Sequence, residues 1–100
     1  MDNSIFEKAK QYIANTYGRF PVAVKSGKGS IIYDIEGKRY IDMGSGIATN
    51  SFGICDDEWT KAITAQLSEY AHVSNLYYSE PQVKLAELLC RRTGMKKIFF

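Results

Sequence analysis

The sequence is poor in cysteine, proline and histidine, and it has no long apolar run. Its two cysteines, Cys55 and Cys90, lie far apart and match no metal-ligand or paired redox spacing, so neither a disulfide framework nor a cysteine metal site is predicted. No run is long enough to span a membrane, and the chain carries Asp2 where a secretory signal would be basic. We therefore expect a cytoplasmic protein without a membrane partner, in which both cysteines are reduced packing residues.

The chain also lacks a large excess of either charge. The 13 Lys and Arg residues nearly balance the 11 Asp and Glu residues, and the net charge of +2 is too small to indicate a nucleic-acid partner. The basic pairs at 91–92 and 96–97 lack the interleaved aromatic residues of a groove for single-stranded nucleic acid. A length of 100 residues, with 45% of them hydrophobic, instead indicates one small globular domain.

The residues of common catalytic sites are missing too. His72 is the single histidine, and no spacing places a nucleophile or a carboxylate beside it, so a nucleophilic triad is not predicted. The acidic run at 56–58 suits the first turn of a helix better than a metal site, which needs more oxygen ligands. No catalytic residue and no metal site are therefore predicted. One alternative stays open, because Cys55 precedes a predicted helix N-terminus, a place where catalytic thiols occur.

What the chain does have is an uncharged, glycine-rich segment at residues 44–54. Glycine allows left-handed backbone and close approach, while Ser, Thr and Asn add short hydrogen-bonding groups. The interleaved Ile47 and Phe52 predict that the segment is packed and at least partly buried. Its glycine spacing fits neither a phosphate loop nor a dinucleotide fingerprint. The segment is a candidate contact with a ligand, and a buried turn is the alternative.

Hydrophobic periodicity and turn residues predict the elements. A helix begins at Ser4 and ends at Gly18, and β-rich pieces follow between residues 22 and 43, two of which form a hairpin. A second helix has residues 56–58 on its first turn, and a third begins with a capping box at Ser79 and ends at Gly94. Residues 96–100 begin a strand that nothing follows, so we expect the sequence to be cut from a longer chain.

Five segments in collinear order cover nearly the whole chain: residues 17–22, 27–29, 33–42, 45–50 and 74–82, the last reading Ser-Asn-Leu-Tyr-Tyr-Ser-Glu-Pro-Gln. Together they resemble the class III pyridoxal-phosphate aminotransferases. The resemblance implies an α+β N-terminal segment of an α/β fold-type-I transferase, with a helix, an antiparallel β piece, two helices and the start of a strand. Residues 1–95 would form the N-terminal part of the small domain and its crossing to the large domain. Residues 96–100 would be the first strand of the large domain, truncated.

The resemblance also implies pyridoxal 5'-phosphate as cofactor, a homodimer, and amino-acid and 2-oxoacid substrates. In the family the lysine, aspartate and helix amides that hold the cofactor follow the strand at 96–100, so no cofactor-binding residue is expected here and this piece alone should be inactive. The run at 75–82 favours a branch that moves the δ-amino group of N-acetylornithine to 2-oxoglutarate by a ping-pong mechanism in arginine biosynthesis. Two alternatives remain: ornithine or another ω-amine as donor, and a non-catalytic fragment or interaction module.

The same resemblance marks six candidate substrate-binding residues. Three resemble elements of the substrate pocket and three resemble a loop at the dimer interface: Tyr17, Gly46 and Ile47, then Asn75, Tyr77 and Tyr78. In one place the chain departs from the family, because it reads Gly-Ile-Cys-Asp at 53–56 where the family usually carries Gly-His-Cys/His-Pro. This departure weakens the assignment of the substrate more than the assignment of the family.

Overall fold

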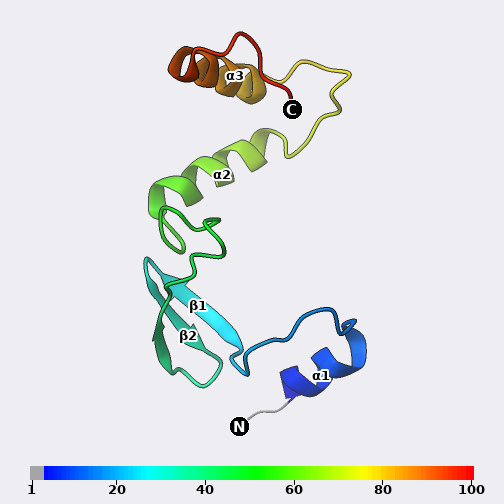
Figure 1. The fold of residues 1–100 in the computed structure, drawn as a ribbon, viewed down its shortest axis with the longest axis vertical. Coiled ribbons are helices and arrows are strands. Elements are labelled where there is room, and N and C mark those ends of the chain that lie inside the picture. The colour runs from blue at the N-terminus through cyan, green and yellow to red at the C-terminus, as the bar shows by residue number, and fades with distance from the viewer. Residues whose placement is uncertain (1–3) are drawn as a thin grey trace. The chain divides into compact units, whose positions relative to one another are not determined.

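The structure, a computed structural model, describes residues 4–100 and divides into two units, Met1–Ile63 and Thr64–Phe100. Along the chain follow α1 (Ser4–Tyr12), β1 (Val24–Lys28), β2 (Ile31–Asp34), β3 (Arg39–Ile41), α2 (Asp57–Glu69) and α3 (Glu80–Thr93), as Figure 1 shows. This order of helix, antiparallel sheet and two helices confirms the predicted α+β segment. No helix of the described part is long and apolar enough to cross a membrane.

Helix α1 is shorter than predicted. The expected end was Gly18, but the helix ends at Tyr12. The residues that follow include Ile13 and Thr16, whose β-branched side chains lower helix propensity. No side chain of α1 is buried, so no packing offsets this cost, and short helices without packing are marginal.

A three-stranded antiparallel sheet, in the order β1-β2-β3, organises the first unit. Lys28 pairs with Ile31 at the end of β1, which leaves a tight turn at residues 29–30. A second turn at residues 35–38 joins β2 to β3, and Gly37 there has a φ of +82°, a conformation that favours glycine. The predicted hairpin is therefore confirmed.

The Asp34 carboxylate holds this second turn together. Among the described residues Asp34 alone is buried, with 7% of its surface exposed. Its Oδ1 accepts the N–H groups of Glu36 and Lys38, both at 2.9 Å, and its Oδ2 accepts the Tyr40 hydroxyl at 2.9 Å. Burial works to raise the pKa of Asp34, but these hydrogen bonds and the Lys38 charge outweigh it, so the pKa lies below its ordinary value of 3.8. The hydrogen bond from its hydroxyl to the Asp34 carboxylate raises the pKa of Tyr40.

The turn between β1 and β2 is tied to a later segment. The Gly29 N–H donates to the Ile54 carbonyl at 2.8 Å, and the Ile54 N–H donates to the Gly29 carbonyl at 2.9 Å. Directly before Ile54, Gly53 has a φ of +98°, and a Cβ on it would lie 3.0 Å from the Gly29 Cα. Both the backbone conformation and the close approach therefore require glycine at position 53.

In the second unit, α3 begins where predicted but without the predicted capping box. Ser79 has extended backbone and makes no side-chain cap hydrogen bond. Its hydroxyl instead lies 3.2 Å from the Tyr70 hydroxyl, and the Gln82 amide donates to Asn75 Oδ1 at 3.2 Å. The capping-box prediction is wrong because both polar groups bond to the connector between α2 and α3. Gly94 ends α3 with a φ of +75°, as predicted.

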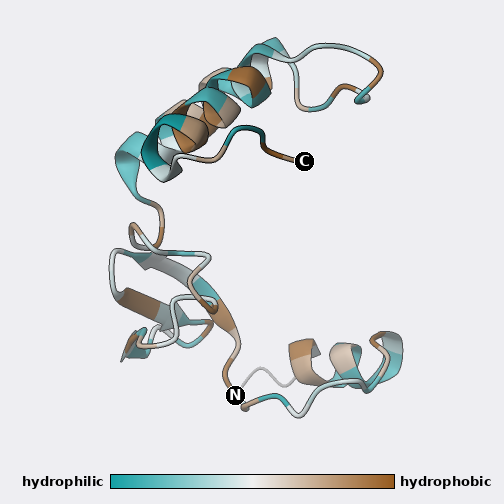
Figure 2. Cartoon of the chain, turned by 45° about the horizontal axis from the view of Figure 1, so that its top comes forward, coloured by the Kyte–Doolittle hydropathy of each residue, from teal (hydrophilic) through white to brown (hydrophobic). Residues whose placement is uncertain are grey.

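No hydrophobic side chain of the described residues is buried. The chain exposes 9307 Å², whereas two self-contained folded units of these sizes would together expose about 6,900 Å². Figure 2 shows hydrophobic residues along the helices, and the α3 side chains of Leu85 and Leu88 are exposed. The partial burial predicted for residues 44–54 is found at Ser45, Gly53 and Ile54, which are half-buried, and is wrong for Ile47 and Phe52, which are exposed. The predicted packing of Cys55 is also wrong for this chain, since Cys55 is exposed.

The strand predicted at residues 96–100 takes no partner among the described residues. A β-strand is stabilised by hydrogen bonds to a neighbouring strand, and the sheet of the described part consists of β1, β2 and β3. The assignment of residues 96–100 to the start of a second domain therefore stays a prediction.

We expect Asp34→Asn to loosen the turn between β2 and β3, since the variant loses the charge and one acceptor oxygen. A lowered pKa stabilises the fold above the ordinary value of 3.8, and this contribution is lost as the pH falls through the lower pKa of the folded state. Amide protection at Glu36 and Lys38 should therefore fall with acid in the wild type, and the variant should lose protection already at neutral pH. Hydrogen exchange of the full-length protein measures both effects. Glu36→Gln is the control, because it makes the same chemical change on a side chain that accepts no hydrogen bond in this turn. Equal protection in Asp34→Asn and wild type contradicts the prediction.

Gly53→Ala should destabilise the first unit, because left-handed backbone costs a side chain on the order of 1–3 kcal/mol and the new Cβ would press on Gly29. Gly44→Ala is the matched control in the same segment. Its Cβ would meet only Asp42 Oδ1 at 3.6 Å, an ordinary contact, so a change within about 0.5 kcal/mol is expected. Urea unfolding of the full-length protein gives both free energies, and equal losses would show that the contact with Gly29 does not constrain position 53.

Candidate functional site

The glycine-rich segment contains a strained left-handed turn. Residues 45–48 have consecutive positive φ angles of 52°, 59°, 56° and 68°. Left-handed backbone costs a residue other than glycine about 1–2 kcal/mol, and a β-branched residue such as Ile47 is rarely found there. The Ile47 N–H donates to the Gly44 carbonyl, and the Asn50 N–H donates to the Ser45 carbonyl, both at 2.9 Å. Strain of this kind concentrates at active sites and ligand contacts, so the turn is the leading candidate site.

The turn presents two of the predicted site residues, Gly46 and Ile47. The Ile47 side chain is 97% exposed, which leaves it free to contact a ligand or another part of a longer protein. A Cβ on Gly46 would lie 3.3 Å from Nδ2 of the Asn50 side chain, so a side chain at position 46 would crowd the turn. The three glycines of the segment are a sequence signal for unusual backbone, but nothing in the sequence pattern indicates that Ile47 takes a positive φ.

Sequence reasoning missed the role of Asp42 at the start of this segment. Its Oδ1 accepts the N–H groups of Gly44 at 3.0 Å and Ser45 at 3.1 Å. Its own N–H donates to the Ser30 carbonyl at 2.8 Å. An aspartate followed by small residues is a signal for such a side-chain turn, and this signal could have been used.

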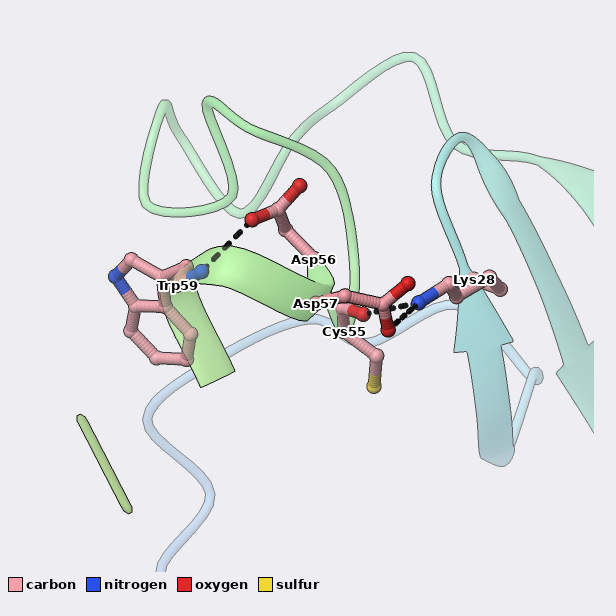
Figure 3. A network of polar contacts seen from close by, with 5 residues as sticks. All are labelled: Lys28, Cys55, Asp56, Asp57 and Trp59. Carbon is pink, nitrogen blue, oxygen red and sulfur yellow. Dashed lines mark hydrogen bonds and ion pairs between the residues drawn. The ribbon is translucent and has the colours of Figure 1, made fainter. Parts of the chain in front are cut away.

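Sequence reasoning also missed Lys28, the last residue of β1, whose side chain contacts residues just after the segment. Its Nζ donates to the Cys55 carbonyl at 2.7 Å and pairs with the Asp57 carboxylate (Figure 3). Asp56 Oδ1 accepts the Trp59 N–H at 2.8 Å, which confirms that the acidic run caps α2. Cys55 takes part through its carbonyl oxygen, and its thiol makes no hydrogen bond within residues 4–100, so its geometry gives the catalytic alternative no support.

A cavity of about 420 Å³ lies beside this network. It is lined by one lysine, three carboxylates and apolar groups: Lys28, Gly29, Phe52, Ile54, Asp56, Asp57 and Glu58. The excess of negative charge makes it a poor site for an anion.

Tyr17 lies outside α1 and exposed, next to Arg19, whose Cζ is 5.8 Å from the centre of the tyrosine ring. This distance is within the range of a cation–π contact. No hydrogen bond or ring contact in the described part joins Tyr17 to Gly46 or Ile47. Gly46 and Ile47, adjacent in the chain, lie on one turn, and the ring contact of Tyr17 is with Arg19.

In the second unit the connector between α2 and α3 surrounds a cavity of about 330 Å³. Both polar and apolar residues line it: Gln66, Tyr70, Ala71, His72, Val73, Ser74, Asn75, Tyr77, Ser79, Pro81 and Gln82. The predicted residues Asn75 and Tyr77 both line it, and the hydrogen bond from Gln82 holds the Asn75 side chain. Tyr78, the third predicted residue of this loop, is 100% exposed and does not line the cavity.

Neither cavity fits pyridoxal phosphate by itself. The cofactor needs a lysine for its aldehyde and anion-binding groups for its phosphate. In the first unit Lys28 is paired with Asp57, and the neighbouring carboxylates would repel a phosphate. The lining of the second-unit cavity contains no lysine or arginine. Residues 4–100 therefore do not form a complete cofactor site.

Known proteins match this chain in sequence and in structure. Residues 12–100 match the family model described as Aminotransferase class-III. Acetylornithine aminotransferase from Methanosarcina acetivorans is 48% identical over 98 residues, which cover 98% of this chain and 25% of the relative. The solved ornithine delta-aminotransferase of Plasmodium falciparum matches with a TM-score of 0.89 and 27% identity, over 95% of this chain and 25% of that chain. The solved acetylornithine aminotransferase of Elizabethkingia anophelis also has a TM-score of 0.89, with 24% identity over 95% and 24% of the two chains.

The chain spans about a quarter of the length of these relatives; it covers 25% of the Methanosarcina acetivorans enzyme. The family match begins at the last residue of α1 and continues through the sheet, the glycine-rich segment, α2 and α3. The chain belongs to the class III aminotransferases.

Proposed function

We propose that this chain is the N-terminal quarter of a pyridoxal-phosphate aminotransferase that moves the δ-amino group of N-acetylornithine to 2-oxoglutarate by a ping-pong mechanism. Its place would be arginine biosynthesis in the cytoplasm. The observation that carries the proposal is the 48% identity to an acetylornithine aminotransferase over 98% of the chain. The cofactor follows from membership of the class III family.

The exposed surface supports a larger protein around this piece. The 9307 Å² that the chain exposes is well above the area of about 6,900 Å² expected for self-contained units. The exposed large hydrophobic side chains include Phe20, Leu76 and Phe99, and apolar groups gathered in this way are normally covered by further chain or by a second subunit. We propose that the rest of the enzyme and a homodimer partner cover it, with residues 1–95 in the small domain and its crossing to the large domain, and residues 96–100 starting the large domain.

In this proposal the chain's own residues bind and orient the substrate. Ile47 and Gly46 offer an apolar, strained surface to the aliphatic part of the amino donor, and Tyr17 adds a ring and a hydroxyl to the same pocket. Asn75, Tyr77 and Tyr78 belong to a loop at the dimer interface that completes the substrate pocket. When bound, the cofactor supplies the electron sink for the transfer, on residues that lie outside this chain.

Two alternatives have an observation in their favour. The likeness to an ornithine delta-aminotransferase, at 27% identity and a TM-score of 0.89, favours ornithine or another ω-amine as donor. The poor fit of both cavities to the cofactor favours a non-catalytic fragment or interaction module for this piece on its own.

The test is a substrate comparison with the full-length protein. On addition of pyridoxal phosphate a visible absorption band should appear, and with 2-oxoglutarate as acceptor the kcat/KM for N-acetylornithine should exceed that for ornithine. A reversed preference would support the ornithine alternative. A full-length protein with neither an absorption band nor amino transfer would rule out the enzyme.

A pair of variants at Ile47 tests the role of the strained turn. Ile47→Ala and Ile47→Gly both remove the three side-chain carbons beyond Cβ. Since each buried methylene contributes about 0.8 kcal/mol, burial of about two of these carbons against the donor predicts that the KM for the amino donor rises roughly tenfold in both. Only Ile47→Gly also relieves the left-handed strain, worth about 1–2 kcal/mol, so it should be the more stable of the two in urea. Steady-state kinetics and unfolding curves of the full-length protein separate the effects, and an unchanged KM in both variants contradicts substrate contact by Ile47.

A further inference from the structure

The last residue of β1 and the turn after it, residues 28–30, hold both ends of a loop, residues 42–54, that contains the glycine-rich segment. At the start of the segment the Asp42 N–H donates to the Ser30 carbonyl at 2.8 Å. At its end, Gly29 and Ile54 exchange two backbone hydrogen bonds of 2.8 and 2.9 Å. Residues 42–54 thus leave and return to one turn of the sheet, which is the geometry of an Ω-loop.

Lys28 adds the side-chain contacts at the return of this loop. Its ammonium donates to the Cys55 carbonyl at 2.7 Å and pairs with the Asp57 carboxylate at the start of α2 (Figure 3). The two side chains are 60% and 92% exposed, and an ion pair so exposed contributes little by itself. The bond to the Cys55 carbonyl is charge-assisted and acts on the backbone next to Ile54, so it reinforces the bridge.

Little else within the first unit holds the loop. Ile47 is 97% exposed and Phe52 is 76% exposed, so neither hydrophobic side chain anchors it. The left-handed turn at 45–48 persists only if surrounding contacts over-determine it. The Ile47 and Asn50 N–H groups close the turn from within, the Asp42 carboxylate holds its start, and the hydrogen bonds from residues 28–30 fix where the loop leaves and returns.

We infer that Lys28 is a positioning residue for the substrate side of the site. It contacts no substrate itself; it fixes the return of loop 42–54 and thereby the place of Ile47 against the aliphatic part of the amino donor. The inference rests on the proposed function, in which Gly46 and Ile47 line the substrate pocket. Loss of Lys28 therefore weakens binding of the amino donor and leaves the chemical step intact.

Lys28→Met in the full-length holoenzyme tests this inference, because methionine keeps the apolar stem and removes both polar contacts. The KM for N-acetylornithine should rise roughly threefold to tenfold, as expected for one or two lost hydrogen bonds, with kcat within about twofold of wild type. Hydrogen exchange of the amides of residues 44–54 should become faster. Lys28→Arg, which can still donate to a carbonyl and a carboxylate, should restore the KM and the protection.

Lys25→Met is the matched control. Lys25 lies on the same strand β1 and is exposed, and no hydrogen bond or ion pair joins it to loop 42–54. Equal shifts of KM in Lys25→Met and Lys28→Met, unchanged exchange in Lys28→Met, or faster exchange with an unchanged KM would each overturn the inference. Hydrogen exchange of residues 44–54 tests whether Lys28 fixes the loop, and it does so even if the protein shows no activity. A wild type that neither binds pyridoxal phosphate nor transfers an amino group overturns the proposed function instead.

Discussion

The backbone bridge between Gly29 and Ile54 brings together parts of the first unit that are far apart in the sequence. Its two hydrogen bonds join the β1–β2 turn to the end of the glycine-rich segment, directly before α2 begins. The bridge excludes a side chain at Gly53, and it sets where the chain must return after the left-handed turn. Since no hydrophobic side chain of the described residues is buried, hydrogen bonds of this kind, with the Asp34 network, provide the order that a core usually provides.

This balance between ordered backbone and exposed apolar side chains has a functional meaning. Within the first unit, the strained turn carries Ile47 outward and offers an apolar surface without a partner in residues 4–100. Within the second unit, the connector between α2 and α3 holds Asn75 through Gln82 and exposes Tyr78 completely. The exposure of both segments agrees with our proposal that further chain of a longer aminotransferase covers them.

The predictions that succeeded depend on residues close in the chain. The hairpin, the acidic cap of α2 and the stop at Gly94 are all set within a few residues. The predictions that failed depend on partners: α1 stops at Tyr12 without packing, and the capping box at Ser79 loses its polar groups to the connector. The burial expected for Ile47, Phe52 and Cys55 fails for the same reason, because no partner among residues 4–100 covers these side chains.

By itself the sequence determined the family and the local elements, because collinear motifs, turn residues and helix caps act between near neighbours. It also placed Gly46 and Ile47 in a candidate site by resemblance. Only the tertiary structure decided that the ends of loop 42–54 meet at one turn, that Ile47 takes a left-handed conformation, and that Lys28 bonds to the Cys55 carbonyl. These features join residues distant in the chain, and hydrophobic periodicity carries no information about which distant backbone groups will pair.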